Sequence, residues 1–152
     1  RYDFFFNLLE KENLDFIVTA HHLNDELETF IINLSRGSGI KGLSGIPKNE
    51  NRILRPFLTF SKAEIYAFAE ENNIDFREDK SNQKDDYLRN KIRNQIVPKM
   101  VEVFPNFLEQ FGESIGYLAT VNQFFQEEIQ KTFDEIFIDG NESDFILNKE
   151  KK

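Results

Sequence analysis

The sequence predicts an α/β fold that continues into one long helix. In the first 36 residues, two segments with helical spacing of apolar side chains, 2–13 and 24–36, flank a short β-branched run at 15–20. Helix, strand and helix in this order are typical of α/β layers. Farther along, apolar residues recur at steps of three and four from Leu108 to Ile136, which predicts a long amphipathic helix.

The first three elements each carry a local pattern. Residues 2–13 have one apolar side, and the run at 15–20 suits a buried parallel strand. Over 24–36 the inward positions follow i, i+3, i+4 and i+7, and they hold Leu27, Phe30, Ile31 and Leu34. Gly37 is a natural C-terminal cap for that helix.

The middle of the chain alternates loops with short elements. A Gly-rich loop at 37–47 leads to a short strand at 53–58. Ser61 and Glu64 then form a capping-box pattern, which predicts a helix that ends near residues 72–73. We expect its inward side chains to be Ile65, Phe68 and Ala69. Another strand is expected at 74–77, followed by a polar loop at 78–86.

Two helices are expected after the polar loop. Residues 87–102 carry Leu88, Ile92 and Ile96 at steps of four, with Pro98 perturbing the end. The long helix follows over 108–137, and a stripe this apolar favours self-association as a homodimer. We therefore divide the chain into an α/β portion at 1–100, a linking helix at 101–138, and a polar tail at 139–152 that begins another domain.

Composition excludes several kinds of site. The 152 residues contain no cysteine, which rules out disulfides, thiolate metal sites and cysteine nucleophiles in this segment and fits a cytoplasmic protein. No apolar run reaches membrane-spanning length, so no membrane partner is expected. The net charge is −8, but residues 36–62 carry six Lys or Arg against Glu50 alone. A local phosphate-binding surface is therefore compatible with an acidic protein.

The candidate catalytic residues are His21, Asp25 and Glu28. They follow the predicted strand at i, i+4 and i+7, so they can share one face of the first helical turns. Ligands of open α/β sheets collect at such strand ends. An imidazole with two carboxylates can hold an ammonium group, orient a proton acceptor or bind a divalent metal. Acidic residues also stabilise a helix N-terminus, so a purely structural role remains the alternative.

Two further clusters have the same two interpretations. Glycines between Gly37 and Gly45 permit close approach of the backbone to phosphates, or simply form a turn. Arg89 and Arg93 lie one helical turn apart, beside Asn90 and Asn94. That face suits bidentate contacts to phosphate or carboxylate, or it is a solvated face opposite the apolar residues.

Together these clusters resemble the tRNA(Ile)-lysidine synthase family. The resemblance rests on the order of five motifs, His-His-x-x-Asp-x-x-Glu-Thr, Arg-Gly-Ser-Gly, Arg-Pro-Phe-Leu, Arg-Glu-Asp-x-Ser-Asn and Arg-Asn-x-x-Arg, which occupy residues 21–29, 36–39, 55–58, 77–82 and 89–93. Arg1 and Tyr2 are similar to the end of the family's arginine-tyrosine helix motif. The match is dense over about the first hundred residues and looser in the long helix.

The resemblance implies a fold, an activity and partners. It implies the C-terminal part of an adenine-nucleotide-hydrolase-like domain of the N-type ATP pyrophosphatase group, followed by a long helix. Such enzymes use ATP to adenylate the wobble cytidine of tRNA(Ile), and the amine of L-lysine then expels AMP to give lysidine. The phosphate loop of the family, with the main ATP and Mg²⁺ site, is expected upstream of Arg1, so we expect this chain to be inactive by itself.

The family pattern also assigns residues. It implies that Arg1, His21, Asp25, Glu28 and Arg93 belong to the active site. The resemblance extends nucleotide or substrate binding to Arg36, Gly37, Gly39 and Arg89, and it assigns no metal ligand to this chain. Asn24 and Glu26 depart from the pattern, which commonly has Asp and Gln there. Two alternatives remain: a related tRNA thiolase, although such enzymes commonly depend on cysteines, or a non-enzymatic helical interaction module.

Overall fold

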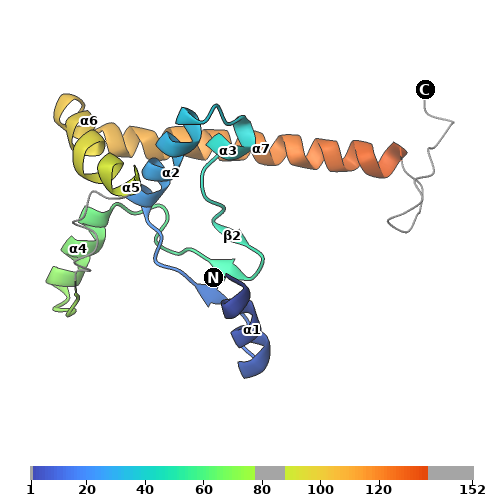
Figure 1. The fold of residues 1–152 in the computed structure, drawn as a ribbon, viewed down its shortest axis with the longest axis horizontal. Helices are drawn as coiled ribbons and strands as arrows, with labels where there is room; N and C mark the ends of the chain where they lie inside the picture. Colours follow the sequence, from blue (N-terminus) through green and yellow to red (C-terminus); the bar gives the residue numbers. More distant parts are fainter. Residues whose placement is uncertain (1, 78–87, 137–152) are drawn as a thin grey trace.

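The computed structural model describes residues 2–77 and 88–136, whose elements gather around one half of a long helix (Figure 1). The strands β1 (Ile17–Val18), β2 (Asn49–Glu50) and β3 (Ile53–Leu54) form one sheet in the order β1-β3-β2. The helices are α1 (Tyr2–Glu12), α2 (Leu23–Ser35), α3 (Ile40–Leu43), α4 (Lys62–Glu71), α5 (Leu88–Lys91), the π-helical turn η2 (Ile92–Ile96), α6 (Val97–Val103) and α7 (Phe107–Ile136). The mixed architecture confirms the predicted α/β class.

The small sheet supports the start of α2. β1 pairs with β3 in parallel, with Ile17 opposite Ile53, which confirms the predicted parallel pairing. The strand is shorter than the run at 15–20, and its expected burial is wrong, because Val18 is 65% exposed. β2 and β3 form an antiparallel hairpin whose two-residue turn places Asn51 and Arg52 at positive φ. β2 was not predicted, because Asn49 and Glu50 carry no strand pattern. The chain leaves β1 and enters α2 within five residues, so α2 begins at the carboxyl end of a parallel strand.

The core lies between α2 and the first half of α7. Leu23 and Leu27 from α2 are buried against Phe111 and Ile115 from α7. Phe30 and Phe111 pack edge to face, with ring centroids 5.4 Å apart. The core therefore uses one side of α2 and leaves its other side to the charged residues described below.

Three local predictions about helix ends are confirmed. Gly37 ends α2 at a φ of 70°, and its N–H donates to the carbonyl of Leu34. Ser61 and Glu64 form the capping box at the start of α4. That helix ends at Asn72, followed by Asn73 at positive φ.

Other predictions in the middle of the chain are wrong. β3 ends at Leu54, and residues 55–60 turn rather than extend the strand. The Gly-rich loop contains α3. No strand forms at 74–77, because the N–H of Ile74 closes the end of α4 on the carbonyl of Ala69. Of the three residues expected inward on α4, Ala69 is buried, whereas Phe68 is 61% exposed.

The helix predicted at 87–102 is interrupted by η2. Ile92 is 2% exposed, but Leu88 and Ile96 are largely exposed, so the expected inward face at steps of four is wrong. The predicted polar loop at 78–86 and Tyr87 lie outside the described residues.

The long helix is confirmed over most of its predicted length, and Phe137 lies outside the described residues. Its stripe is packed only in the first half, where Phe111 and Ile115 are buried. Phe125 and Ile129 are exposed on the half that extends beyond the other elements in Figure 1.

Candidate active site at the start of α2

The start of α2 is fixed by a capping box made from two of the motif residues. Nδ1 of His22 accepts a hydrogen bond from the Asp25 N–H at 3.3 Å, and Asp25 Oδ2 accepts one from the His22 N–H at 3.1 Å. Burial lowers the pKa of His22, although the nearby Asp25 carboxylate opposes the shift. His22 is therefore neutral at pH 7, with Nδ1 as an acceptor and its proton on Nε2.

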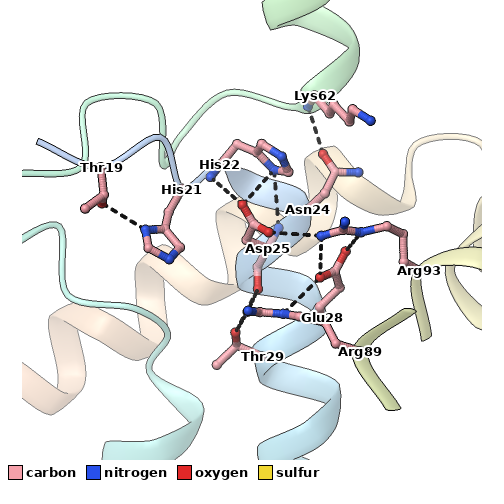
Figure 2. Close-up of polar contacts among 10 residues, drawn as sticks. All are labelled: Thr19, His21, His22, Asn24, Asp25, Glu28, Thr29, Lys62, Arg89 and Arg93. Carbon is pink, nitrogen blue, oxygen red and sulfur yellow. Dashed lines mark hydrogen bonds and ion pairs between the residues drawn. The ribbon is translucent and has the colours of Figure 1, made fainter. Parts of the chain in front are cut away.

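Glu28 lies one turn farther along α2 and is a buried carboxylate held by two guanidinium groups (Figure 2). Its side chain is only 1% exposed. Arg93 donates to it twice, from Nε to Oε1 at 2.6 Å and from a terminal nitrogen to Oε2 at 2.9 Å. Arg89 Nε forms a further ion pair with Oε2 at 3.1 Å. Bidentate geometry of this kind is what makes burial of a carboxylate tolerable.

Asp25 shares Arg93 with Glu28 but holds it less tightly. Asp25 Oδ1 accepts from the same terminal nitrogen of Arg93 at 3.2 Å, and the Asp25 side chain is 15% exposed. The bonds with Glu28 dominate the raised pKa of Arg93. The two carboxylates and two guanidiniums balance in charge, so a cationic ligand would have to displace Arg93 from Asp25 rather than from Glu28.

Arg89 is turned onto α2 through Thr29. A terminal nitrogen of Arg89 donates to Thr29 Oγ1 at 2.8 Å, and the Thr29 hydroxyl donates to the Asp25 carbonyl at 2.8 Å. Thr29 was not predicted as a site residue. Its place at the end of the motif at 21–29 and its position four residues after Asp25 were the available signals, because the partner arginine is 60 residues away in sequence.

His21 lies beside this charged cluster rather than within it. Its Nδ1 is 2.8 Å from Thr19 Oγ1, and Figure 2 shows the ring on the other side of the α2 start from Arg93. Burial lowers the pKa of His21; Asp25 opposes this shift, and the nearby positive charges of Arg55 and Arg89 add to it. A neutral imidazole is therefore available as a proton acceptor at pH 7. Arg55, buried and donating to the Pro47 carbonyl, was not predicted to influence it.

Asn24 and Glu26, the two departures from the family pattern, both have structural partners. Asn24 Oδ1 accepts from the Lys62 N–H at 2.8 Å and so ties the start of α2 to the start of α4. Glu26 is buried, and its Oε1 accepts from the Ile46 N–H at 3.0 Å. Burial raises the pKa of Glu26 to about 7, despite the opposing hydrogen bond from Ile46. Gly45 has a φ of 86° and passes close to this carboxyl, so a Cβ there would lie 2.1 Å from Oε1 and would force the Glu26 side chain to move.

The other predicted binding residues do not join the cluster. Arg36, Gly37 and Gly39 lie at or beyond the far end of α2, about 16 Å along the helix from Asp25 at a rise of about 1.5 Å per residue. Their role in nucleotide binding stays a prediction. Arg1 lies outside the described residues.

Two properties of the described residues bear on the site. In residues 2–77 and 88–136, no group of three or more His, Asp or Glu side chains is arranged to hold a metal ion. Mg²⁺ is commonly held by only one or two carboxylates together with substrate phosphates, so the Mg²⁺ site expected upstream of Arg1 stays a prediction, and we derive no step through a metal. No helix in the same part of the chain is both long and apolar enough to cross a membrane.

Comparison with known proteins identifies the class to which this fold and site belong. Residues 1–100 match the family model ATP_bind_3, described as a PP-loop domain. The match covers well over half of the chain, so the chain belongs to the PP-loop domain family.

Within that class, the similar curated proteins share one name. The chain is 35% identical over 139 residues to a tRNA(Ile)-lysidine synthase of Enterococcus faecalis, covering 89% of this chain and 30% of the relative. It is 39% identical over 131 residues to that of Geobacillus kaustophilus, covering 84% and 28%. It is 38% identical over 135 residues to that of Petrotoga mobilis, covering 89% and 42%. The chain thus spans less than half the length of these relatives.

Proposed function

We propose that this chain supplies the lysine-binding part of an ATP-dependent tRNA(Ile)-lysidine synthase. The proposal rests on one observation above all: Asp25, Glu28, Arg89 and Arg93 form a charge-balanced cluster at the start of α2. That helix begins at the carboxyl end of a parallel strand, where α/β domains bind their substrates. Membership of the PP-loop family and the names of the relatives supply the reaction class.

The proposed reaction has two steps. The carbonyl oxygen of the wobble cytidine attacks the α-phosphate of ATP, and diphosphate leaves. The lysine amine then attacks the activated ring carbon, AMP leaves, and the amine loses a proton. The nucleophile must be the neutral amine, so a site for lysine must first hold an ammonium group and then let it lose a proton.

Asp25 is the carboxylate best placed to receive the ammonium group. Its contact with Arg93, at 3.2 Å, is the longest of the carboxylate–guanidinium contacts in the cluster, and its side chain is the more exposed of the two carboxylates. Glu28 has both oxygens engaged by arginines and is closed to solvent. We therefore assign Glu28 to holding Arg89 and Arg93 in place. This assignment narrows the initial expectation that both carboxylates bind the amine.

His21 and Arg93 complete the proposed set. Because burial keeps the pKa of His21 low, its neutral ring can accept the proton that the amine releases. The Arg93 guanidinium, freed from Asp25 by the incoming ammonium, can then stabilise negative charge on the adenylate. Both roles use groups that lie at the same end of α2 (Figure 2).

The proposed tRNA surface is smaller than the basic segment at 36–62. Arg52 is paired with Glu10, and Arg55 is buried against Pro47. Lys62 Nζ lies over the Tyr66 ring, 4.8 Å from its centroid. Arg36, Lys41 and Lys48 are exposed, so we assign phosphate contacts to these three. Charge reversal at Lys41 and Lys48 should flatten the salt dependence of tRNA binding by up to about one unit of slope for each lost contact. An unchanged slope would remove this surface from the proposal.

The activity is tested with the full-length protein, ATP, lysine and tRNA(Ile). AMP release that requires lysine and a cytidine at the wobble position supports the proposal, with a uridine transcript as the control. AMP release that requires a sulfur donor instead of lysine would identify a thiolase. Absence of AMP release under both conditions would favour a non-enzymatic interaction module.

A further inference from the structure

The helix that carries Arg89 and Arg93 contains a π-helical turn directly after its first segment. η2 covers Ile92–Ile96, and the Val97 N–H donates to the Ile92 carbonyl five residues back. A π turn inserts one residue relative to an α-helix and is usually retained because the site needs it. Arg93, which binds Asp25 and Glu28 of α2, lies within this turn.

Pro98 gives the π turn a local cause. It lies at the start of α6, where its missing N–H is tolerated. In an uninterrupted α-helix, the ring of Pro98 would clash with the carbonyl of Asn94, four residues back. The extra residue of η2 allows α6 to begin anew at Val97 and removes that conflict.

The burial pattern indicates what the extra residue changes. After buried Ile92, an uninterrupted α-helix would turn Ile96 inward, yet Ile96 is 43% exposed and Val97 packs against the core instead. One inserted residue rotates everything after it by about 100° around the helix axis. α6 therefore places Val97 on the core while α5 keeps Arg89 facing α2.

We propose that the π turn, imposed by Pro98 and by the residue count between Ile92 and Val97, positions Arg93 on Asp25 and Glu28. Without the extra residue, a single helix could not turn both Ile92 and Val97 toward the core. If the helix rotated to keep Val97 packed, Ile92 would lose its packing and Arg93 would turn away from α2. The expected consequence of misplacing Arg93 is a selective loss of lysine binding, and this expectation rests on the proposed function.

The test compares two changes at Gln95, an exposed residue within the turn. Deletion of Gln95 in the full-length protein removes the extra residue, whereas Gln95→Ala removes the side chain and keeps the residue count. We expect the deletion to lower kcat/KM for lysine by about 100-fold, the effect of misplacing a catalytic contact by about 1 Å. The KM for ATP should stay near the wild-type value, and Gln95→Ala, which keeps the helical phase, should change kcat/KM for lysine far less than the deletion does. A folded deletion variant with the wild-type kcat/KM for lysine would overturn the proposal.

Pro98→Ala provides a second test if the deletion variant does not fold. Alanine restores an N–H and removes the ring clash, so α-helical geometry becomes accessible at this point. We expect the KM for lysine to rise by roughly 10-fold, with Pro105→Ala as a control proline outside the turn. An unchanged KM for lysine in Pro98→Ala, with the deletion variant unfolded, would also overturn the proposal.

A direct readout separates this inference from the proposed function. The Arg93 Nε–H donates to Glu28 Oε1 at 2.6 Å. In nitrogen-15 NMR spectra, its proton should therefore be protected from exchange with solvent in wild type and in Gln95→Ala. It should lose protection in Pro98→Ala or in the deletion variant. If the wild-type protein forms no lysidine but the signal behaves as expected, the proposed function fails and the positioning role of the π turn stands. Equal protection in all folded variants contradicts the positioning role whatever the activity.

Discussion

The helices α2 and α4 begin with the same local device and differ in what surrounds it. In α2, the His22 side chain caps the Asp25 N–H, and the Asp25 carboxylate caps the His22 N–H. In α4, Ser61 and Glu64 make the same pair of bonds at 3.1 and 2.7 Å. In both boxes the carboxylate stands three residues after the cap.

The two capping boxes differ in their tertiary contacts. Glu64 is exposed, and hydrogen bonds from Ser61 lower its pKa. Asp25 makes the same type of capping bond and in addition accepts from Arg93, 68 residues away. A carboxylate that only caps its own helix therefore does not indicate a functional site. A carboxylate that also binds a residue from a distant helix, as Asp25 binds Arg93, does indicate one. Glu64 is accordingly the natural control for changes at α2.

The largest difference should appear on removing the buried charge of α2. Glu28→Gln leaves Arg89 and Arg93 without their shared carboxylate, and we expect it to lower the free energy of unfolding by about 3 kcal/mol. The two arginines are partly exposed, so water can solvate them once the carboxylate is gone, and the expected loss of stability stays at the low end of what breaking a buried ion pair costs. Glu64→Gln should cost about 1 kcal/mol or less. Urea denaturation at pH 7 measures both, and equal losses would remove the distinction between the two helix starts.

Asp25→Asn should separate activity from stability. The amide can still cap the His22 N–H, so we expect a stability loss of about 1 kcal/mol or less. Loss of the charge that receives the ammonium should lower kcat/KM for lysine by about 100-fold, equivalent to about 3 kcal/mol of transition-state stabilisation. Glu64→Gln should leave turnover unchanged. Wild-type kinetics in Asp25→Asn would exclude the ammonium-binding role.

The residue after each capping carboxylate provides a pH test, because α2 has Glu26 where α4 has Ile65. Burial raises the pKa of Glu26 to about 7 from its ordinary value of 4.5. The folded state thus holds this proton more tightly, so the contribution of Glu26 to stability is complete below pH 4.5 and is lost as pH rises to about 7. Glu26→Gln, which can still accept from Ile46, should be more stable than wild type at pH 8 by about 3 kcal/mol and equal to it near pH 4. Denaturation midpoints across this range check the sign.

The smallest expected effect concerns the two capping side chains. The His22 cap requires a neutral Nδ1, and burial lowers the pKa of His22, so its contribution is present above pH 6.5 and is lost as pH falls below that value. His22→Ser should match wild type at pH 8 within about 0.5 kcal/mol and should exceed it at pH 5 by about 1 kcal/mol. Ser61→Ala should cost about 1 kcal/mol at both pH values. A flat pH response of the difference between wild type and His22→Ser would contradict the assignment of the histidine as a neutral cap.

Elements that depend on neighbouring residues were predicted correctly, whereas elements that depend on distant contacts were not. The capping box at Ser61, the Gly37 cap and the helices α1, α2 and α7 were predictable, since each depends on residues within four positions of one another. The expected strand at 74–77 failed, because strand formation requires a partner that no local pattern specifies. The inward face predicted for residues 87–102 failed because one inserted residue changes the helical phase.

From the sequence alone, Asp25 and Glu28 could be placed on one face at the start of a helix, because their spacing sets the side of the helix that carries them. His21 precedes α2 and lies on the other side of the helix start from Arg93, so the expectation that it shares this face is wrong. The different burial and the different arginine contacts of Asp25 and Glu28 depend on the tertiary structure. Packing of α5 and η2 against α2 brings Arg93 to both carboxylates, buries Glu28 between two arginines, and leaves Asp25 with the longer and more exposed contact. The physical reason is that an ion pair across 65 residues depends on the rotation and approach of two helices, which the spacing within either helix does not encode.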